Sequence, residues 1–157
     1  MLISGYYLII EKNNGGGKMS VSQISVFLEN KSGALANLTT TLADNNINIK
    51  AMSVAETSEF GIVRMIVDDV YEATTILKDT GFIAKFNRVI AVTIADEPGS
   101  LNEVIKILSN MGVDVEYMYA FLGGEKADHA NIILRVQELD AAESALRNAG
   151  LELLDEE

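Results

Sequence analysis

The stretch FLENKSGAL (residues 27–35) decides the fold, because a second stretch, TIADEPGSL (residues 93–101), repeats its pattern. Each begins as an apolar run typical of a β-strand, passes through polar residues, reaches a glycine and continues with helical periodicity. Asn30 aligns with Asp96 and Gly33 with Gly99, and both pairs are 66 residues apart. Self-similarity at one fixed period indicates a duplicated structural unit. We therefore expect two copies of one small fold.

The first copy, residues 23–88, reads as strand, helix, strand, strand, helix and strand. Period-two alternation predicts strands near residues 23–29, 47–53, 62–67 and 82–88, with a hairpin near residues 58–61. Leu35, Leu38 and Leu42 recur at helical spacing and are expected on the buried face of the first helix. Ala73, Ile76 and Leu77 are expected to do the same in the second helix.

The second copy, residues 89–157, repeats this order without a linker, because residues 89–95 already form its first strand. Further strands are expected at residues 113–122, 131–136 and 151–154, with a longer hairpin at residues 123–128. The inward face of its first helix is predicted to carry Leu101, Val104, Ile105, Leu108 and Met111.

Helix ends also recur in the two copies. Asn45 and Asn46 should end the first helix, because Asn tolerates the left-handed conformation of a C-terminal cap, and Gly81, Gly112 and Gly150 should end the other helices. Capping-box spacing precedes the second helix of each copy, at Asp69 and Glu72 and at Asp140 and Glu143.

This element order predicts an α+β protein of two ferredoxin-like βαββαβ units, each an antiparallel sheet with helices on one face. A unit of about 65 residues buries little of its surface alone, so we expect the two units to share an interface. Tyr117 and Tyr119 alternate on one strand and share a sheet face, which favours a packing or interface role.

Residues 1–22 stand outside the duplication and are interpreted as a leader strand (6–11) and a flexible, glycine-rich linker (13–18). The linker lacks the spacing of a phosphate-binding loop. Met19 is an alternative start of the natural chain. The expected domains are therefore residues 1–22, 23–88 and 89–157.

Composition excludes several classes of function. The 157-residue chain carries a formal charge of −11 and no local basic stripe, which argues against nucleic-acid binding. It has no cysteine, so disulfides, thiolate metal sites and a cysteine nucleophile are excluded. No apolar run reaches the roughly 20 residues that span a bilayer. We expect a cytoplasmic protein without membrane contact, metal or cofactor.

The repeated turn, followed by a helix ending in NNINI (residues 45–49) or MGVDV (residues 111–115), resembles the ACT domain, twice. The resemblance covers about residues 23–154. ACT domains are small regulatory modules that usually bind amino acids, so the resemblance implies an amino-acid sensor. It also implies a partner that is a separate enzyme of amino-acid metabolism. Repeat one has Ser32 where the family often has proline, and repeat two has Gly112 where an asparagine is common, so the two sites are expected to be unequal.

The residues themselves suit this chemistry. Glycine at the strand-to-helix junction lets a ligand approach the backbone, and the helix N-terminus offers N–H groups and a positive dipole end to a carboxylate. Asn30 or Asp96 can supply a side-chain oxygen to an ammonium group, and Asn46 can reach the same pocket from a neighbouring unit if sheets pair side by side. The predicted ligand-binding residues are Asn30, Lys31, Ser32, Gly33, Ala34, Leu35, Asn46, Ile47, Asp96, Glu97, Pro98, Gly99, Ser100, Leu101, Gly112 and Val113.

Other interpretations stay open at this point. Asn30 and Asp96 can instead be helix N-caps, and the glycines and Pro98 can serve turn geometry alone. The fold can also belong to an assembly module without a ligand, and exposed sheet edges favour a homodimer in either case. An enzyme is not expected, because His129 is the single histidine and no catalytic triad, metal cluster or nucleotide loop is recognisable.

Overall fold

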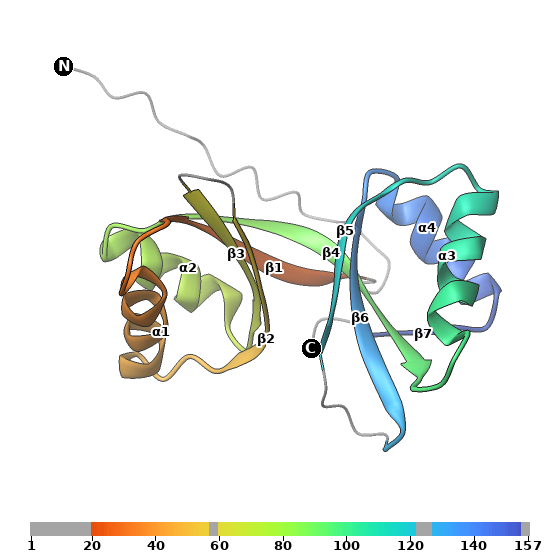
Figure 1. Ribbon diagram of the computed structural model, residues 1–157, viewed down its shortest axis with the longest axis horizontal. Coiled ribbons are helices and arrows are strands. Elements are labelled where there is room, and N and C mark those ends of the chain that lie inside the picture. The colour runs from red at the N-terminus through yellow and green to blue at the C-terminus, as the bar shows by residue number, and fades with distance from the viewer. Residues whose placement is uncertain (1–19, 57–59, 122–126, 155–157) are drawn as a thin grey trace.

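The computed structural model describes residues 20–56, 60–121 and 127–154 (Figure 1). The predicted leader strand and linker, and parts of both predicted hairpins, lie outside these residues. The elements follow the predicted order: β1 (Val21–Glu29), α1 (Ala34–Asp44), β2 (Ile49–Glu56), β3 (Phe60–Val67), α2 (Val70–Asp79), β4 (Ile83–Ala95), α3 (Ser100–Asn110), β5 (Val115–Phe121), β6 (His129–Val136), α4 (Leu139–Asn148) and β7 (Glu152–Leu154).

One strand, β4, belongs to both units. It pairs antiparallel with β1 as far as Val89, and with β6 from Ile90 onward, while β7 also pairs with its second half. The first unit therefore has the strand order β2-β3-β1-β4, and the second has β7-β4-β6-β5. This is the ferredoxin-like order in each half, so the predicted α+β fold of two such units is confirmed.

The two strands predicted at residues 82–88 and 89–95 are a single strand of 13 residues. Residues 89–92 form a continuous buried apolar run without a turn residue, so the strand and its hydrogen-bonded ladder continue across the junction. The domain boundary between Arg88 and Val89 stays a prediction, since the chain has no loop there.

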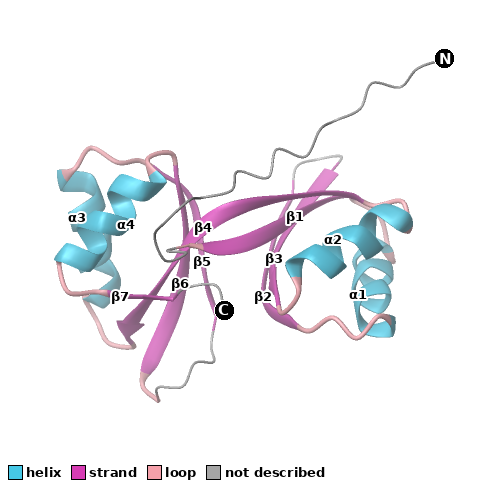
Figure 2. Cartoon of the chain, turned by 180° about the vertical axis from the view of Figure 1, so that it is seen from behind, coloured by secondary structure: helices cyan, strands magenta, loops and turns pink. Residues whose placement is uncertain are grey.

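Each unit has its own core between its sheet and its two helices. Figures 1 and 2 show α1 with α2 at one end of the molecule and α3 with α4 at the other, with the sheet between them. Fully buried side chains that fill the first core include Ile24, Leu38, Leu42, Met65 and Leu77. Their counterparts in the second core include Ile90, Val104, Leu134 and Leu146.

A third cluster joins the helix-free faces of the two sheets, so the expected shared interface is confirmed. The sheet curls, and its inner surface buries Ala51, Ile66, Val89, Ala91 and Ile133, with Tyr119 and Phe121 packed against them. The interface role predicted for Tyr119 is therefore confirmed. No helix within the described part of the chain is long and apolar enough to cross a bilayer.

A buried glutamine forms hydrogen bonds across this interface. The Gln23 side chain has no exposed surface, and its amide nitrogen donates to the Tyr117 hydroxyl at 2.8 Å. The Tyr119 hydroxyl donates to the other end of the same amide, at 2.9 Å. Burial raises the pKa of Tyr119, so its hydroxyl stays a proton donor. Both tyrosines come from β5 and Gln23 from β1, so the network holds the two units in one relative orientation.

All four helices end in the same hydrogen-bonded motif. In α1 the Asn46 N–H donates to the Ala43 carbonyl at 3.0 Å, and the Ile47 N–H donates to the Leu42 carbonyl at 3.0 Å. This is a Schellman motif, which places its central residue in the left-handed region. Asn46 has φ 59° there, and the corresponding positions of the other helices are Gly81, Gly112 and Gly150, all with positive φ. The predicted helix ends are confirmed.

Some predicted side-chain environments are wrong. Leu35 and Leu101 lie in the first turns of α1 and α3 and are 40% and 37% exposed, and Met111 is 43% exposed past the end of α3. Helical spacing places these residues on the inward face, but they lie at the helix ends, whereas the buried residues of the same helices are Leu38, Leu42, Val104 and Leu108.

The predicted capping boxes have different outcomes. Asp69 does cap α2, since its carboxylate accepts from the Glu72 N–H at 2.9 Å. The second box is wrong: α4 begins after Glu138, whose side chain makes no cap. Asp140 lies inside the helix and accepts from Arg88 at 3.3 Å, and Glu143 is buried.

Candidate functional site

The two repeated turns have the same backbone. In the first, the Ala34 N–H donates to the Lys31 carbonyl at 3.2 Å, and in the second Ser100 donates to Glu97 at 3.3 Å. The glycines that follow are both left-handed, with φ 85° at Gly33 and φ 101° at Gly99. The sequence repeat therefore encodes a conformational repeat, and both turns are exposed at the surface.

Glycine occupies the N-cap position of both helices. Gly33 precedes α1 and Gly99 precedes α3, and neither helix receives a side-chain cap hydrogen bond. The interpretation of Asn30 and Asp96 as N-caps is therefore wrong, because each lies three residues before the cap. The first N–H groups of a helix have no intrahelical partner, so both helices begin with donors that no side chain caps.

The two turns require glycine because of their backbone conformation and not because neighbouring atoms crowd these positions. A β-carbon built at either position would meet no heavy atom within 4 Å, so neither glycine is enclosed by protein. A positive φ is costly for other residues, and most costly for β-branched ones. The space beside each glycine is open, so a ligand can approach the backbone there.

Side chains around the first turn are largely paired. The Asn30 amide donates to the Glu56 carboxylate at 3.3 Å, linking the turn to the end of β2. Lys31 forms an ion pair with Glu29, and this hydrogen bond and the lysine charge lower the pKa of Glu29. The first turn of α1 contains no acidic residue. The start of α1 itself therefore carries no acid, and the carboxylates beside the turn are Glu29, paired with Lys31, and Glu56, bonded to Asn30.

The second turn is more acidic. Asp96 and Glu97 precede Gly99, and Glu103 lies in the first turn of α3. The Asp96 N–H donates to the Asp128 carbonyl at 2.9 Å, which ties the turn to the residues before β6. A carboxylate ligand would be repelled here by three carboxylates, so the two turns are unequal in charge although they are equal in shape.

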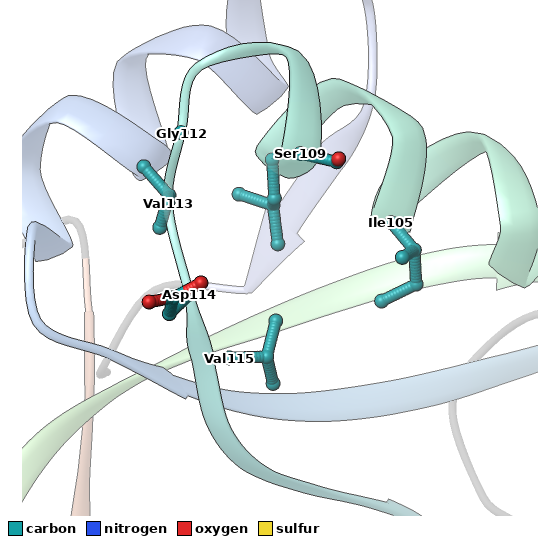
Figure 3. A pocket seen from close by; sticks show the side chains of 7 residues that line it. Ile105, Ser109, Gly112, Val113, Asp114 and Val115 are labelled. Atoms are coloured by element: carbon teal, nitrogen blue, oxygen red, sulfur yellow. The ribbon is translucent and has the colours of Figure 1, made fainter.

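A shallow pocket of about 280 Å³ lies at the other end of α3 (Figure 3). The side chains of Ile105 from α3 and Val115 from β5 point toward one another across it. Two predicted site residues, Gly112 and Val113, line it, and the other lining residues are Leu108, Ser109 and Asp114. Asp114 was not among the predicted site residues, although its place directly after Gly112 and Val113 is a signal that could have identified it.

The predicted site residues form four separate groups within one chain. In each unit the turn and the helix end are separated by the helix itself, which for the 11 residues of α1 is about 16 Å. The two turns lie near opposite ends of β4, whose 13 residues extend roughly 40 Å. The side chains of Ile47 and Val113 belong to the two cores and are 6% and 9% exposed, and Val113 also lines the pocket at the end of α3. The structure therefore does not bring Asn46 to either turn.

In the part of the chain that the structure describes, no three His, Asp or Glu side chains are grouped in a way that could hold a metal ion. His129 is exposed at the start of β6, with its Nδ1 3.0 Å from the Ala127 carbonyl oxygen.

Comparison with known proteins agrees with this geometry. A family model described as an ACT domain pair matches residues 19–157. The chain belongs to this family. This ACT domain pair is therefore built from regulatory modules, as the sequence resemblance implied. No functionally curated protein matches it.

Several solved structures resemble this ACT domain pair. Protein BT0572 from Bacteroides thetaiotaomicron is 38% identical, with a TM-score of 0.82 over 88% of this chain and 94% of its own. The regulatory subunit of aspartate kinase from Thermus thermophilus is 17% identical, with a TM-score of 0.61 over 84% and 93%. The corresponding subunit from Thermus flavus is 15% identical, with a TM-score of 0.59 over 84% and 94%. The last two likenesses show the shared fold.

Proposed function

We propose that this ACT domain pair is a non-enzymatic sensor that binds a free α-amino acid and regulates a separate enzyme of amino-acid metabolism. One observation carries the proposal: two exposed helix N-termini follow a left-handed glycine and have no side-chain cap. Such a helix start presents N–H groups and a positive dipole end. That combination suits the carboxylate of an amino acid.

The first turn is the stronger carboxylate site. Lys31 offsets Glu29 and α1 has no acid in its first turn, so the Glu56 carboxylate that accepts from Asn30 is the remaining negative charge described there. Asp96, Glu97 and Glu103 place three negative charges at the second turn. A charge near a helix N-terminus changes binding there by about 0.3–1 kcal/mol. The amino acid should therefore occupy the turn at Gly33 before the turn at Gly99.

Helix C-termini offer the opposite polarity. The pocket at the end of α3 combines the negative end of a helix dipole with the Asp114 carboxylate, and both attract an ammonium group. The half-buried apolar side chains of Ile105 and Val115 provide contacts for an aliphatic side chain. A zwitterion bridging a helix start and a helix end would have both of its charges matched.

A second copy of the chain is needed to form that bridge. Within one chain the turn and the helix end are about 16 Å apart, the length of the 11-residue helix between them. Side-by-side pairing of two chains can bring a helix end of one copy, at Asn46 or Gly112, to a turn of the other. We therefore infer a homodimer whose ligand sites lie between the copies.

The partner enzyme is inferred from the family and the fold. ACT domain pairs are regulatory, and solved structures with this fold include regulatory subunits of aspartate kinase. The residues that the structure describes contain no recognisable catalytic cluster, so the regulated activity would be that of another polypeptide. Cytoplasmic enzymes of amino-acid synthesis are the natural candidates for such a regulator.

Thermal denaturation with each of the twenty amino acids tests the proposal. A ligand that binds only the folded state at 100 times its dissociation constant adds about 2.7 kcal/mol of stability, so one chemical group of amino acids should raise the midpoint. The matched variants Asn30→Leu and Asp96→Leu compare the two turns, and we expect the first to reduce the ligand-induced rise more. Absence of any rise at millimolar concentration would instead favour an assembly module without a small ligand.

A further inference from the structure

The helix-free face of the first unit carries an exposed row of apolar side chains. In the sheet register Phe27 stands opposite Ile62 on one side and Ile83 on the other, and Ile62 stands opposite Ala55. Phe27 is 38% exposed and Ile83 65% exposed. We call this set the apolar row: Ala55, Ile62, Phe27 and Ile83. A contiguous exposed apolar patch is characteristic of an interaction site.

A second row, two residues nearer the unit interface, carries positive charge. In the register Ser25 stands opposite both Arg64 and Lys85, and Arg64 stands opposite Ser53. We call this set the cationic row: Ser53, Arg64, Ser25 and Lys85. The Arg64 guanidinium carbon lies 3.9 Å from the centre of the Tyr117 ring, so β5 of the second unit holds it in place.

The two cations of this row carry charge that the described residues do not neutralise. Neither Arg64 nor Lys85 forms an ion pair with any residue that the structure describes. On the far side of the apolar row the nearest acid on this face is Glu29, which Lys31 already pairs. In a chain with a formal charge of −11, two unpaired cations beside an apolar row indicate a partner of opposite charge.

The spacing of the rows sets the shape of that partner. The apolar row crosses four strands, which are about 4.8 Å apart, and therefore extends about 14 Å. Three turns of an α-helix cover a similar length, with apolar residues every three or four positions. The cationic row lies about 7 Å to one side, a distance that side chains on the flank of such a helix can reach.

We infer that this face docks an amphipathic helix with acidic residues along one flank, contributed by another protein. Its apolar stripe would lie across Phe27 and Ile83, and its carboxylates would face Arg64 and Lys85. A helix fits better than an added strand, because strand addition uses the edge of a sheet and these side chains lie on its face. The inference names the contact surface for the partner in the proposed function and rests on that partner, but it shares no residue with the two turns.

A peptide titration tests this surface in the full chain. The probe is a synthetic helix of about 14 residues with leucine on one face and glutamate along one flank, and its matched control carries lysine in place of glutamate. Amide signals of the isotope-labelled protein are followed by two-dimensional NMR. We expect the glutamate peptide to shift the signals of both rows, and the lysine peptide to bind at least tenfold more weakly.

Charge-matched variants sharpen the result. Arg64→Gln with Lys85→Gln should weaken the glutamate peptide about tenfold, whereas Lys50→Gln with Lys106→Gln, which removes the same charge elsewhere, should leave its affinity unchanged. Because Arg64 also contacts Tyr117, Lys85→Gln alone provides a second measurement, with an expected loss of about threefold.

Several outcomes would overturn the inference. These are equal binding of the two peptides, signal shifts confined to other surfaces, equal effects of the two double variants, or no shift at millimolar peptide. Shifts in the same rows that grow with protein concentration alone would identify a second copy as the occupant instead. The amino-acid thermal shift is measured on the same variants, so loss of the docking surface and loss of the sensor function are separated.

Discussion

The first and second turns have nearly the same backbone and different charge. Both have a left-handed glycine at the N-cap, φ 85° at Gly33 and φ 101° at Gly99, and both helices begin without a side-chain cap. Near Gly33, Lys31 pairs with Glu29 and the Glu56 carboxylate accepts from Asn30, whereas Asp96, Glu97 and Glu103 lie near Gly99 without a cation in the turn. Conformation was retained in the duplicated unit while the electrostatics diverged. One fold can therefore offer two sites of different selectivity.

The comparison of the two turns depends first on the two units keeping one fixed relative orientation. Gln23→Met keeps the side-chain shape but removes the bonds to Tyr117 and Tyr119, leaving two partly buried hydroxyls without this partner. We expect a loss of about 2–4 kcal/mol in the free energy of unfolding, since an unsatisfied buried group costs about 1–3 kcal/mol. Denaturant unfolding measures it. Thr74→Val, which removes a buried hydrogen bond inside the first unit alone, is the control; an equal loss in both would show that the interface has no special role.

Valine substitutions at the two turn glycines test whether the backbone conformation of the turns and the charge around them have separate effects on stability and on amino-acid binding. Gly33→Val and Gly99→Val both force a β-branched residue to a positive φ, and each should cost about 1–2 kcal/mol of stability. Stability is compared by thermal unfolding, and amino-acid binding by calorimetry on the same samples. Binding should fall much more in Gly33→Val. Equal losses of binding would mean that the turns are functionally equivalent.

An exchange at the helix ends refines the comparison further. Asn46 and Gly112 occupy equivalent left-handed positions, with φ 59° and 70°. Asn46→Gly should stabilise the protein, and Gly112→Asn should destabilise it, each by at most about 1 kcal/mol, because glycine has no steric penalty at positive φ. Paired thermal melts measure the difference. Changes of the same sign would indicate that the Asn46 side chain contributes a contact of its own.

The smallest expected effect concerns pH. Glu29 has a pKa below its ordinary 4.5 because Lys31 bonds to it, and the second turn has Ala95 and Glu97 at the matching positions. A lowered pKa contributes stability above the ordinary value, and this is lost as pH falls through the folded-state value. Lys31→Gln should return the Glu29 titration, followed by NMR, toward 4.5. Because both groups are exposed, midpoints should change little, and an unchanged titration would disprove the pairing.

Much of the fold followed from local patterns. The order of helices and strands, the glycines at 81, 112 and 150 and the Asp69 cap depend on residues close in sequence, and all were predicted. The duplicated turn was found for the same reason. These features are set by backbone preference and by short-range hydrogen bonds, which a single sequence records directly.

Other features depend on contacts between distant residues and were not predictable in this way. Gln23 meets Tyr117 and Tyr119 across 94 and 96 positions, and no local pattern connects them. Leu35 and Leu101 share the helical spacing of buried leucines but are exposed in the first turns of their helices, because burial depends on how the helix ends lie in three dimensions. For the candidate site, the turns were located, but their separation from the helix ends follows from the three-dimensional arrangement of α1 and α3.

Strand β4 also restricts how the chain can change in length. Side chains at even positions, such as Ala84 and Ile90, face the helices, and odd positions, such as Val89 and Ala91, face the unit interface. One residue inserted near position 89 would reverse this order for every following position of the strand, exposing one core and filling the other with the wrong side chains. Two inserted residues would preserve it. Evolutionary insertions and deletions at the junction of these two units should therefore involve even numbers of residues.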